Sequence, residues 1–141
     1  MADEARSREI REHDPEGRRT VRDAQETLPE FRALLRLPGE ANALVCVRTR
    51  LTVGTVSALV WLLVIKATRE GFVASVFEVP PELNGLMIGD RFDVASGEVA
   101  DWMYNMDGIL HGGFSLREQR ARLGVEEQAW FDERIGVTQY I

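Results

Sequence analysis

The sequence predicts one α+β domain, in which a twisted antiparallel sheet of five or six strands is flanked by an N-terminal helical segment and a C-terminal helix pair. Helical spacing of apolar residues comes first, short apolar segments separated by turn residues follow, and helical spacing returns near the C-terminus. The 141 residues suit a single domain, and 45% hydrophobic residues suffice for a core without disulfide bonds.

The N-terminal segment, residues 1–18, is expected to form a disordered or frayed tail, which leaves residues 19–141 as the domain. The tail mixes Arg with Asp and Glu, and Ile10 stands alone there among small and charged residues. Such a segment cannot bury enough apolar surface to offset the entropy that ordering would cost.

A helical segment is expected next, because Val21, Ala24 and Leu28 recur at spacings of three and four residues. Pro29 interrupts this pattern, since proline is tolerated in the first turn of a helix but not in its interior. The sequence therefore predicts two short helices, or one helix that is kinked at residues 27–29.

Strands are expected through the middle of the chain. Apolar segments bounded by Gly, Pro and Asp-Gly predict strands at residues 44–51, 56–68, 72–79, 87–94 and 98–104, and a hairpin at Asp107-Gly108 that leads into 109–110. Residues 58–65 are apolar on both faces, which is typical of a fully buried strand, so we expect 56–68 to be the central strand. The expected packing joins two sets of side chains: Trp61 and Ile65 on this strand, and Phe31 with Leu34 or Leu35 on the helical segment.

Two helices are expected to close the chain. Ser115 and Glu118 have the spacing of a capping box, in which each side chain bonds an orphan N–H at the start of a helix. Gly124 is expected to end that helix as a left-handed cap. Residues 126–134 then predict a last helix that ends at Gly136.

Charge and composition restrict the classes of function. The net charge of −6 disfavours nucleic acid, whose affinity for proteins comes largely from Lys and Arg replacing counterions. The longest apolar run falls far short of the roughly 20 residues of a membrane-spanning helix, and the N-terminus lacks the apolar region of a secretory signal. Cys46 is the only cysteine, and its apolar neighbours indicate a buried thiol in a reducing compartment. We therefore expect a cytoplasmic protein that binds neither nucleic acid nor a membrane.

Four short motifs resemble a known family. They are Thr27-Leu28-Pro29-Glu30-Phe31, Gly89-Asp90-Arg91-Phe92-Asp93-Val94, Asp101-Trp102-Met103-Tyr104 and Gly112-Gly113-Phe114. Together they resemble the bacterial domain of unknown function 2314, the YegJ-like proteins, over about residues 20–123, which leaves 124–141 as a helical C-terminal extension. The family has no established activity, so the resemblance implies a fold and a surface but no reaction.

The chain departs from this family in the strand that is expected at the centre of the sheet. The family usually carries an acidic residue and a histidine, or a similar polar residue, just before the tryptophan of that strand. Here Ala58, Leu59 and Val60 precede Trp61. Any role of those polar residues is therefore absent from this chain.

Asp101, Trp102 and Tyr104 are the first candidates for a binding surface. A carboxylate beside amphipathic rings suits a small ligand or a protein partner, and Trp and Tyr are typical anchors of interfaces. In the alternative interpretation, Trp102 and Tyr104 alternate with Met103 on a strand and fill a core, and Asp101 bonds a nearby backbone N–H. The sequence leaves both interpretations open.

His111, with Gly112 and Gly113, is the second candidate. It is the only histidine outside the tail, so acid–base chemistry would use it, with Asp101 or Asp107 within about 4–6 Å. The two glycines lack the spacing of a phosphate-binding loop and instead suit a sharp strand-to-helix turn.

The sequence disfavours two further kinds of site, a metal site and a DNA-binding helix pair. The spacing of Asp90, Asp93, Asp101, Asp107 and His111 does not enforce a metal site, and both Asp90 and Asp107 stand where turns favour Asp. The region 115–135 has the layout of a helix-turn-helix, but its second helix is acidic and phosphates would repel it.

The sequence thus predicts a non-catalytic binding or protein-interaction module that uses the surface of residues 101–114. Its partner would be a protein or a small ligand, no cofactor or metal is implied, and a homodimer stays open. The alternative is a small hydrolase-like or ligand-processing enzyme that uses His111 with Asp101 or Asp107.

Overall fold

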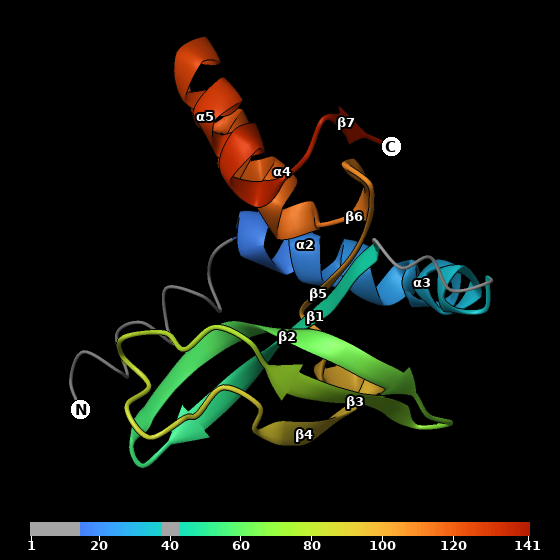
Figure 1. Ribbon diagram of the computed structural model, residues 1–141, viewed down its shortest axis with the longest axis vertical. Coiled ribbons are helices and arrows are strands. Elements are labelled where there is room, and N and C mark those ends of the chain that lie inside the picture. The colour runs from blue at the N-terminus through green and yellow to red at the C-terminus, as the bar shows by residue number, and fades with distance from the viewer. Residues whose placement is uncertain (1–14, 38–42) are drawn as a thin grey trace.

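Seven strands form one sheet in the computed structural model, which describes residues 15–37 and 43–141. The strand order is β4-β3-β2-β1-β5-β6-β7 (Figure 1), and every neighbouring pair is antiparallel except β6 and β7, which are parallel. The α+β class is therefore confirmed, while the sheet is larger than the expected five or six strands and is mixed. The extra strand, Gln139–Tyr140, has two residues, which is too short to leave an alternating pattern in the sequence.

The six longer strands lie close to the expected segments. Their bounds are Ala43–Val53 for β1, Val56–Ala67 for β2, Gly71–Val76 for β3, Arg91–Ala95 for β4, Asp101–Met106 for β5 and Ile109–Gly112 for β6. Strand β4 begins four residues later than expected, because the Asp90 carboxylate accepts a bond from the Met87 backbone N–H at 2.9 Å and closes a turn there. Strand β5 also begins later, since Ser96–Glu98 form a short 3-10 helix, η1.

The N-terminal helical segment consists of two helices, α2 (Pro15–Glu26) and α3 (Leu28–Leu35). The predicted break at residues 27–29 is confirmed, with proline in the first turn of α3. Helix α2 already begins inside the segment that was expected to be a tail. The rest of that tail, residues 1–14, lies outside the described residues.

The predicted helix pair at the C-terminus is present as α4 (Phe114–Ala121) and α5 (Val125–Ile135). The left-handed Gly136, with φ of 71°, ends α5 as predicted. The expected left-handed cap at Gly124 is wrong, because Gly124 is extended and is the residue that precedes α5. Figure 1 shows α5 projecting from the body of the molecule, at the end opposite to β4. None of the helices in the described ranges is both long and apolar enough to cross a membrane.

The central strand is β1, and the prediction that β2 holds this place is wrong. In β2 the side chains of Ala58, Val60 and Leu62 are buried, whereas Trp61 is half-buried and Ile65 is 42% exposed. Successive side chains of a strand point to opposite faces, so Trp61, which stands between the buried Val60 and Leu62, lies on the face away from the main core. Ile65 lies at the irregularity in the β2–β3 register between Val64 and Lys66. An apolar run on both faces thus indicated a buried strand without showing which face the helices cover.

The main core lies between α2, α3 and one face of the sheet. Phe31 of α3 stacks on Trp102 with ring centroids 4.8 Å apart and also contacts Phe72 at 5.4 Å. Leu34 and Leu35 are partly buried against the same cluster. The expected packing of Phe31 on Trp61 and Ile65 is therefore wrong, because β5 and β3 supply the rings that face this helix.

Candidate functional site

Asp101 joins strand β5 to the start of helix α4. Its side chain is fully buried, and one carboxylate oxygen accepts bonds from the backbone N–H groups of Trp102 at 2.8 Å and Phe114 at 3.1 Å. The other oxygen accepts from the Ser115 N–H at 2.8 Å and the Ser115 hydroxyl at 2.6 Å. The first N–H groups of a helix have no partner within the helix, so Asp101 caps α4 from a distant strand.

This arrangement corrects the predicted capping box of Ser115 and Glu118. The structure gives α4 no side-chain cap of its own, and the residue that precedes it is the left-handed Gly113. The Ser115 hydroxyl donates to Asp101 instead. Burial raises the pKa of the Asp101 carboxyl, while the hydrogen bonds from Ser115, Trp102 and Phe114 act to lower that pKa.

Trp102 and Tyr104 belong to the core. Trp102 is 1% exposed, its indole N–H donates to the Thr27 hydroxyl at 3.0 Å, and Tyr104 is 5% exposed. The interpretation that these rings fill a core and that Asp101 bonds nearby backbone N–H groups is therefore confirmed. These three side chains present no surface to a partner.

Gly112 and Gly113 make the turn between β6 and α4. Their φ angles are 71° and 65°, in the region that favours glycine. A Cβ on Gly112 would lie 2.5 Å from the Trp102 carbonyl oxygen and 2.6 Å from its ring. The Gly113 N–H donates to the same carbonyl at 2.6 Å. The glycines thus let the chain reverse directly against Trp102.

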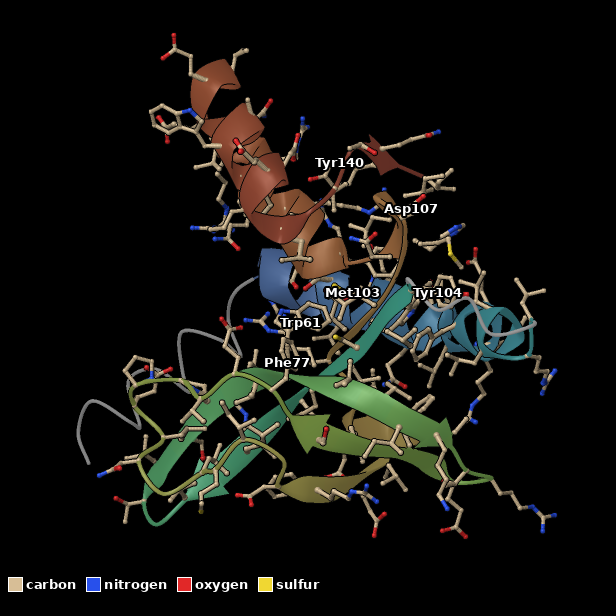
Figure 2. The ribbon with its side chains drawn as sticks, in the orientation of Figure 1. Trp61, Phe77, Met103, Tyr104, Asp107 and Tyr140 are labelled. Atoms are coloured by element: carbon tan, nitrogen blue, oxygen red, sulfur yellow. The ribbon has the colours of Figure 1, made fainter. Side chains whose placement is uncertain are left out.

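His111 does not meet Asp101. It pairs with Tyr104 in the β5–β6 register, and the two rings meet edge to face at 6.0 Å. Asp101 lies three residues before Tyr104, so it points to the opposite face of the sheet. Asp107 is exposed at the tip of the β5–β6 hairpin (Figure 2). An acid–base pair of His111 with Asp101 is therefore not formed.

The structure also shows where the candidate metal ligands and Cys46 lie. Within residues 15–37 and 43–141, no three His, Cys, Asp or Glu side chains come together in a group that could hold a metal ion. Cys46 is buried, as expected, and desolvation, with a smaller effect from the charge of Glu78, raises the pKa of its thiol to about 12. Cys46 lies on the same face of the sheet as Met103, its partner in the β1–β5 register, and Trp61, the partner of Arg48 in the β1–β2 register.

A cleft of about 960 Å³ lies where the start of α2, strands β1 and β2, the η1–β5 connection and α4 meet. Four arginines from three elements line it, namely Arg18 of α2, Arg48 and Arg50 of β1, and Arg122 just after α4. Val21 and Leu59 add apolar walls. Arg18, Arg50 and Arg122 are exposed, and Arg48 is half-buried.

Arginine is the commonest charged residue among the described residues that line the cleft. Four arginines stand there against two carboxylates, Glu98 and Glu118, in a chain whose net charge is −6. Glu98 accepts a bond from the Ala95 N–H at 3.2 Å, and Glu118 lies 3.6 Å from Arg122.

The Asp101 junction and the cleft adjoin each other. Ala100 and Ser115, the neighbours of Asp101 in the chain and in space, both line the cleft. By fixing the start of α4 against β5, Asp101 therefore fixes one wall of the cleft. The sequence did not reveal this site, because its residues come from segments up to about one hundred positions apart. The placement of Arg48 and Arg50 on one face of a strand is the signal that could have found it.

Leu59 connects the cleft with the departure from the family pattern. It is one of the three apolar residues that precede Trp61, at the positions where the resemblance leads one to expect polar side chains. In this chain the corresponding wall of the cleft is therefore apolar.

Comparisons with known proteins agree with the motifs in the sequence. A model of a bacterial family described as "Uncharacterized protein conserved in bacteria (DUF2314)" matches residues 14–138. A putative ankyrin repeat protein of Neisseria meningitidis serogroup B is 31% identical over 58 residues, which cover 41% of this chain and 23% of that protein. The chain thus aligns with less than a quarter of the length of this relative. No solved structure matches the chain significantly.

Proposed function

The chain belongs to the DUF2314 family of uncharacterized bacterial proteins, and from this premise we propose that it is a non-catalytic binding module. Its binding site is the arginine-lined cleft, and its ligand is an acidic segment of a protein. The cleft is the single observation that carries this proposal. The surface of residues 101–114 that the sequence suggested is replaced by this neighbouring site, because its central side chains are buried.

The size and the charge of the cleft support this ligand. Ligand pockets typically enclose about 300–1,000 Å³, and the cleft, at about 960 Å³, lies at the upper end of that range. Guanidinium groups bind carboxylates through paired, charge-assisted hydrogen bonds. Strand β1 is the centre of the sheet, so Arg48 and Arg50 start from a rigid backbone.

The apolar walls favour a peptide over a bare inorganic anion. Val21, from α2, and Leu59, from β2, give a ligand with both apolar and acidic side chains something to contact besides charge. The Neisseria relative, which is similar over part of its length, is named for ankyrin repeats. Repeat proteins of that kind use extended concave surfaces for binding, so this context also supports a binding role.

The proposal is tested by titrating hexaglutamate into the protein in a calorimeter at low salt, with hexalysine as the control peptide. The wild type should bind hexaglutamate and not hexalysine. The Arg18→Gln, Arg50→Gln double variant should bind at least about tenfold more weakly, because each lost charge-assisted bond is worth roughly 1 kcal/mol or more.

A matched variant carries Arg69→Gln and Arg91→Gln, which remove two exposed arginines outside the cleft. It should keep the wild-type affinity, and added salt should weaken the binding of both proteins. Equal affinity of the wild type and the cleft variant for hexaglutamate would remove the cleft as the binding site.

A further inference from the structure

Helix α5 exposes apolar surface that the fold does not use. Val125 is 85% exposed and Trp130 is 69% exposed, whereas Phe131 on the other side of the helix is 3% exposed. An isolated exposed leucine or valine is ordinary, but a tryptophan is the residue most enriched at the centres of protein interfaces. Helix α5 also projects from the body of the molecule (Figure 1).

The exposed side of α5 is acidic as well as apolar. Glu126, Trp130 and Glu133 stand at spacings of four and three residues, so they share one face of the helix. All three are exposed. A helix rises 1.5 Å per residue, so the two carboxylates stand roughly 10 Å apart along the axis, with the indole between them.

The arginine-lined cleft complements this stripe. The stripe presents a carboxylate, an indole and a second carboxylate, and the cleft presents guanidinium groups around the apolar walls of Val21 and Leu59. A cavity of about 960 Å³ has the volume of a cube with an edge of about 10 Å, which matches the length of the stripe. The chain thus carries both halves of one complementary contact.

The same chain cannot bring these halves together by itself. Residues 122–124 are the whole connection between α4 and α5. Arg120 of α4 binds Asp132 of α5 through two bonds of 2.8 and 3.0 Å, and the Tyr140 hydroxyl also bonds Asp132. These contacts hold α5 against α4 with its acidic stripe outward, so the cleft that it fills belongs to another copy.

We propose that this protein self-associates by seating the α5 stripe of one copy in the arginine-lined cleft of a second copy. The proposal rests on the proposed function, because it names a partner for the same cleft. Trp130 contacts Val21 and Leu59, and the carboxylates of the stripe face the arginines. Each copy carries one stripe and one cleft, so each of two copies can seat its stripe in the cleft of the other while α5 stays bound to its own α4, which closes a twofold dimer with two identical contacts.

A charge exchange tests the contact. One variant carries Glu126→Arg and Glu133→Arg, so both its stripe and its cleft are basic. The other carries Arg18→Glu and Arg50→Glu, so both are acidic. Sedimentation velocity across the micromolar range should give dimers for the wild type, monomers for each variant alone, and dimers again when the two variants are mixed, because mixing restores both contacts of the dimer.

Trp130→Ala should also give monomers, and all of the changed residues are exposed, so melting curves should show folded proteins. Hexaglutamate should dissociate the wild-type dimer. A wild type that stays monomeric but binds hexaglutamate overturns the self-association and leaves the proposed function standing, whereas a monomer that does not bind hexaglutamate overturns both. Dimers that persist in either charge variant show that another surface is used.

Discussion

The Asp101 junction and the arginine-lined cleft lie side by side, yet they are built on opposite principles. At the junction every unusual residue has a partner inside the fold: Asp101 holds the start of α4, Trp102 bonds Thr27, and Gly112 lets the chain pass against the indole. In the cleft the side chains are ordinary arginines and glutamates from separate elements, and three of its four arginines are exposed.

This difference shows that a cluster of unusual residues in a sequence can have a structural role in folding and need not mark a functional site. A buried carboxylate, a tryptophan with a polar partner and two left-handed glycines are each costly to place, so they occur together where the chain makes a difficult connection. A charged binding surface needs no such residues. It needs several elements to bring common side chains to one place.

The largest expected effect is a difference in the free energy of unfolding between the alanine variants of two tryptophans. Trp102→Ala should lower the free energy of unfolding by about 3–5 kcal/mol, the usual cost of truncating a buried aromatic side chain. Trp130→Ala should change it by no more than about 0.5 kcal/mol, as for other exposed side chains away from special contacts. Urea denaturation measures both, at a protein concentration low enough to keep the wild type monomeric, because dissociation of a dimer would add to the apparent free energy of unfolding. A similar loss in the two variants would erase the distinction between the junction and the exposed surface.

A smaller loss is expected at the carboxylate of the junction. Asp101→Ala should lower the free energy of unfolding by about 2–4 kcal/mol, because the N–H groups of Trp102, Phe114 and Ser115 lose their acceptor in a buried place. Urea denaturation again gives the value. A loss below about 0.5 kcal/mol would mean that α4 does not depend on this cap.

Asp101→Asn provides the control for charge, with denaturation followed against pH. Burial raises the folded-state pKa of Asp101 above the unfolded value of about 3.9, so the protonated form is favoured by folding. The stability of the wild type relative to the Asn variant should therefore be greatest below about pH 3.9 and should fall as the pH rises through the raised pKa. A relative stability that grows with pH would show that the hydrogen bonds outweigh burial.

The smallest expected effect lies in the cleft. Arg18→Gln with Arg50→Gln should leave the free energy of unfolding within about 0.5 kcal/mol of the wild type, because both side chains are exposed. The same pair of changes is expected to weaken hexaglutamate binding. A strong loss of stability would place these arginines among the residues that hold the fold.

Much of the fold could be predicted from local patterns. The break at Pro29, the first three strands and the hairpin at Asp107-Gly108 each follow from proline, β-branched runs and turn residues that act over a few positions. The predictions that were wrong concern residues whose partners lie far away in the sequence. Ser115 has the spacing of a cap, but its hydroxyl donates its hydrogen bond to Asp101, fourteen positions earlier in the sequence.

The central strand and the binding site could not be predicted for the same reason. The run around Trp61 is apolar on both faces, and only the positions of α2 and α3 decide which face becomes the main core. The cleft joins Arg18, Arg50 and Arg122, whose proximity is a property of the assembled sheet and helices. Nothing in the local sequence of any one of them marks a shared site.

We propose that ligands bind in the cleft and not on the motif-rich segment beside it. Amide chemical shifts of the ¹⁵N-labelled protein, followed during a hexaglutamate titration, test this directly. We expect the largest changes in chemical shift at cleft residues such as Arg18, Arg50 and Gln119, while the shifts of His111 and Asp107 stay unchanged. Shifts centred on Tyr104, Asp107 and His111, with the cleft unaffected, would contradict it.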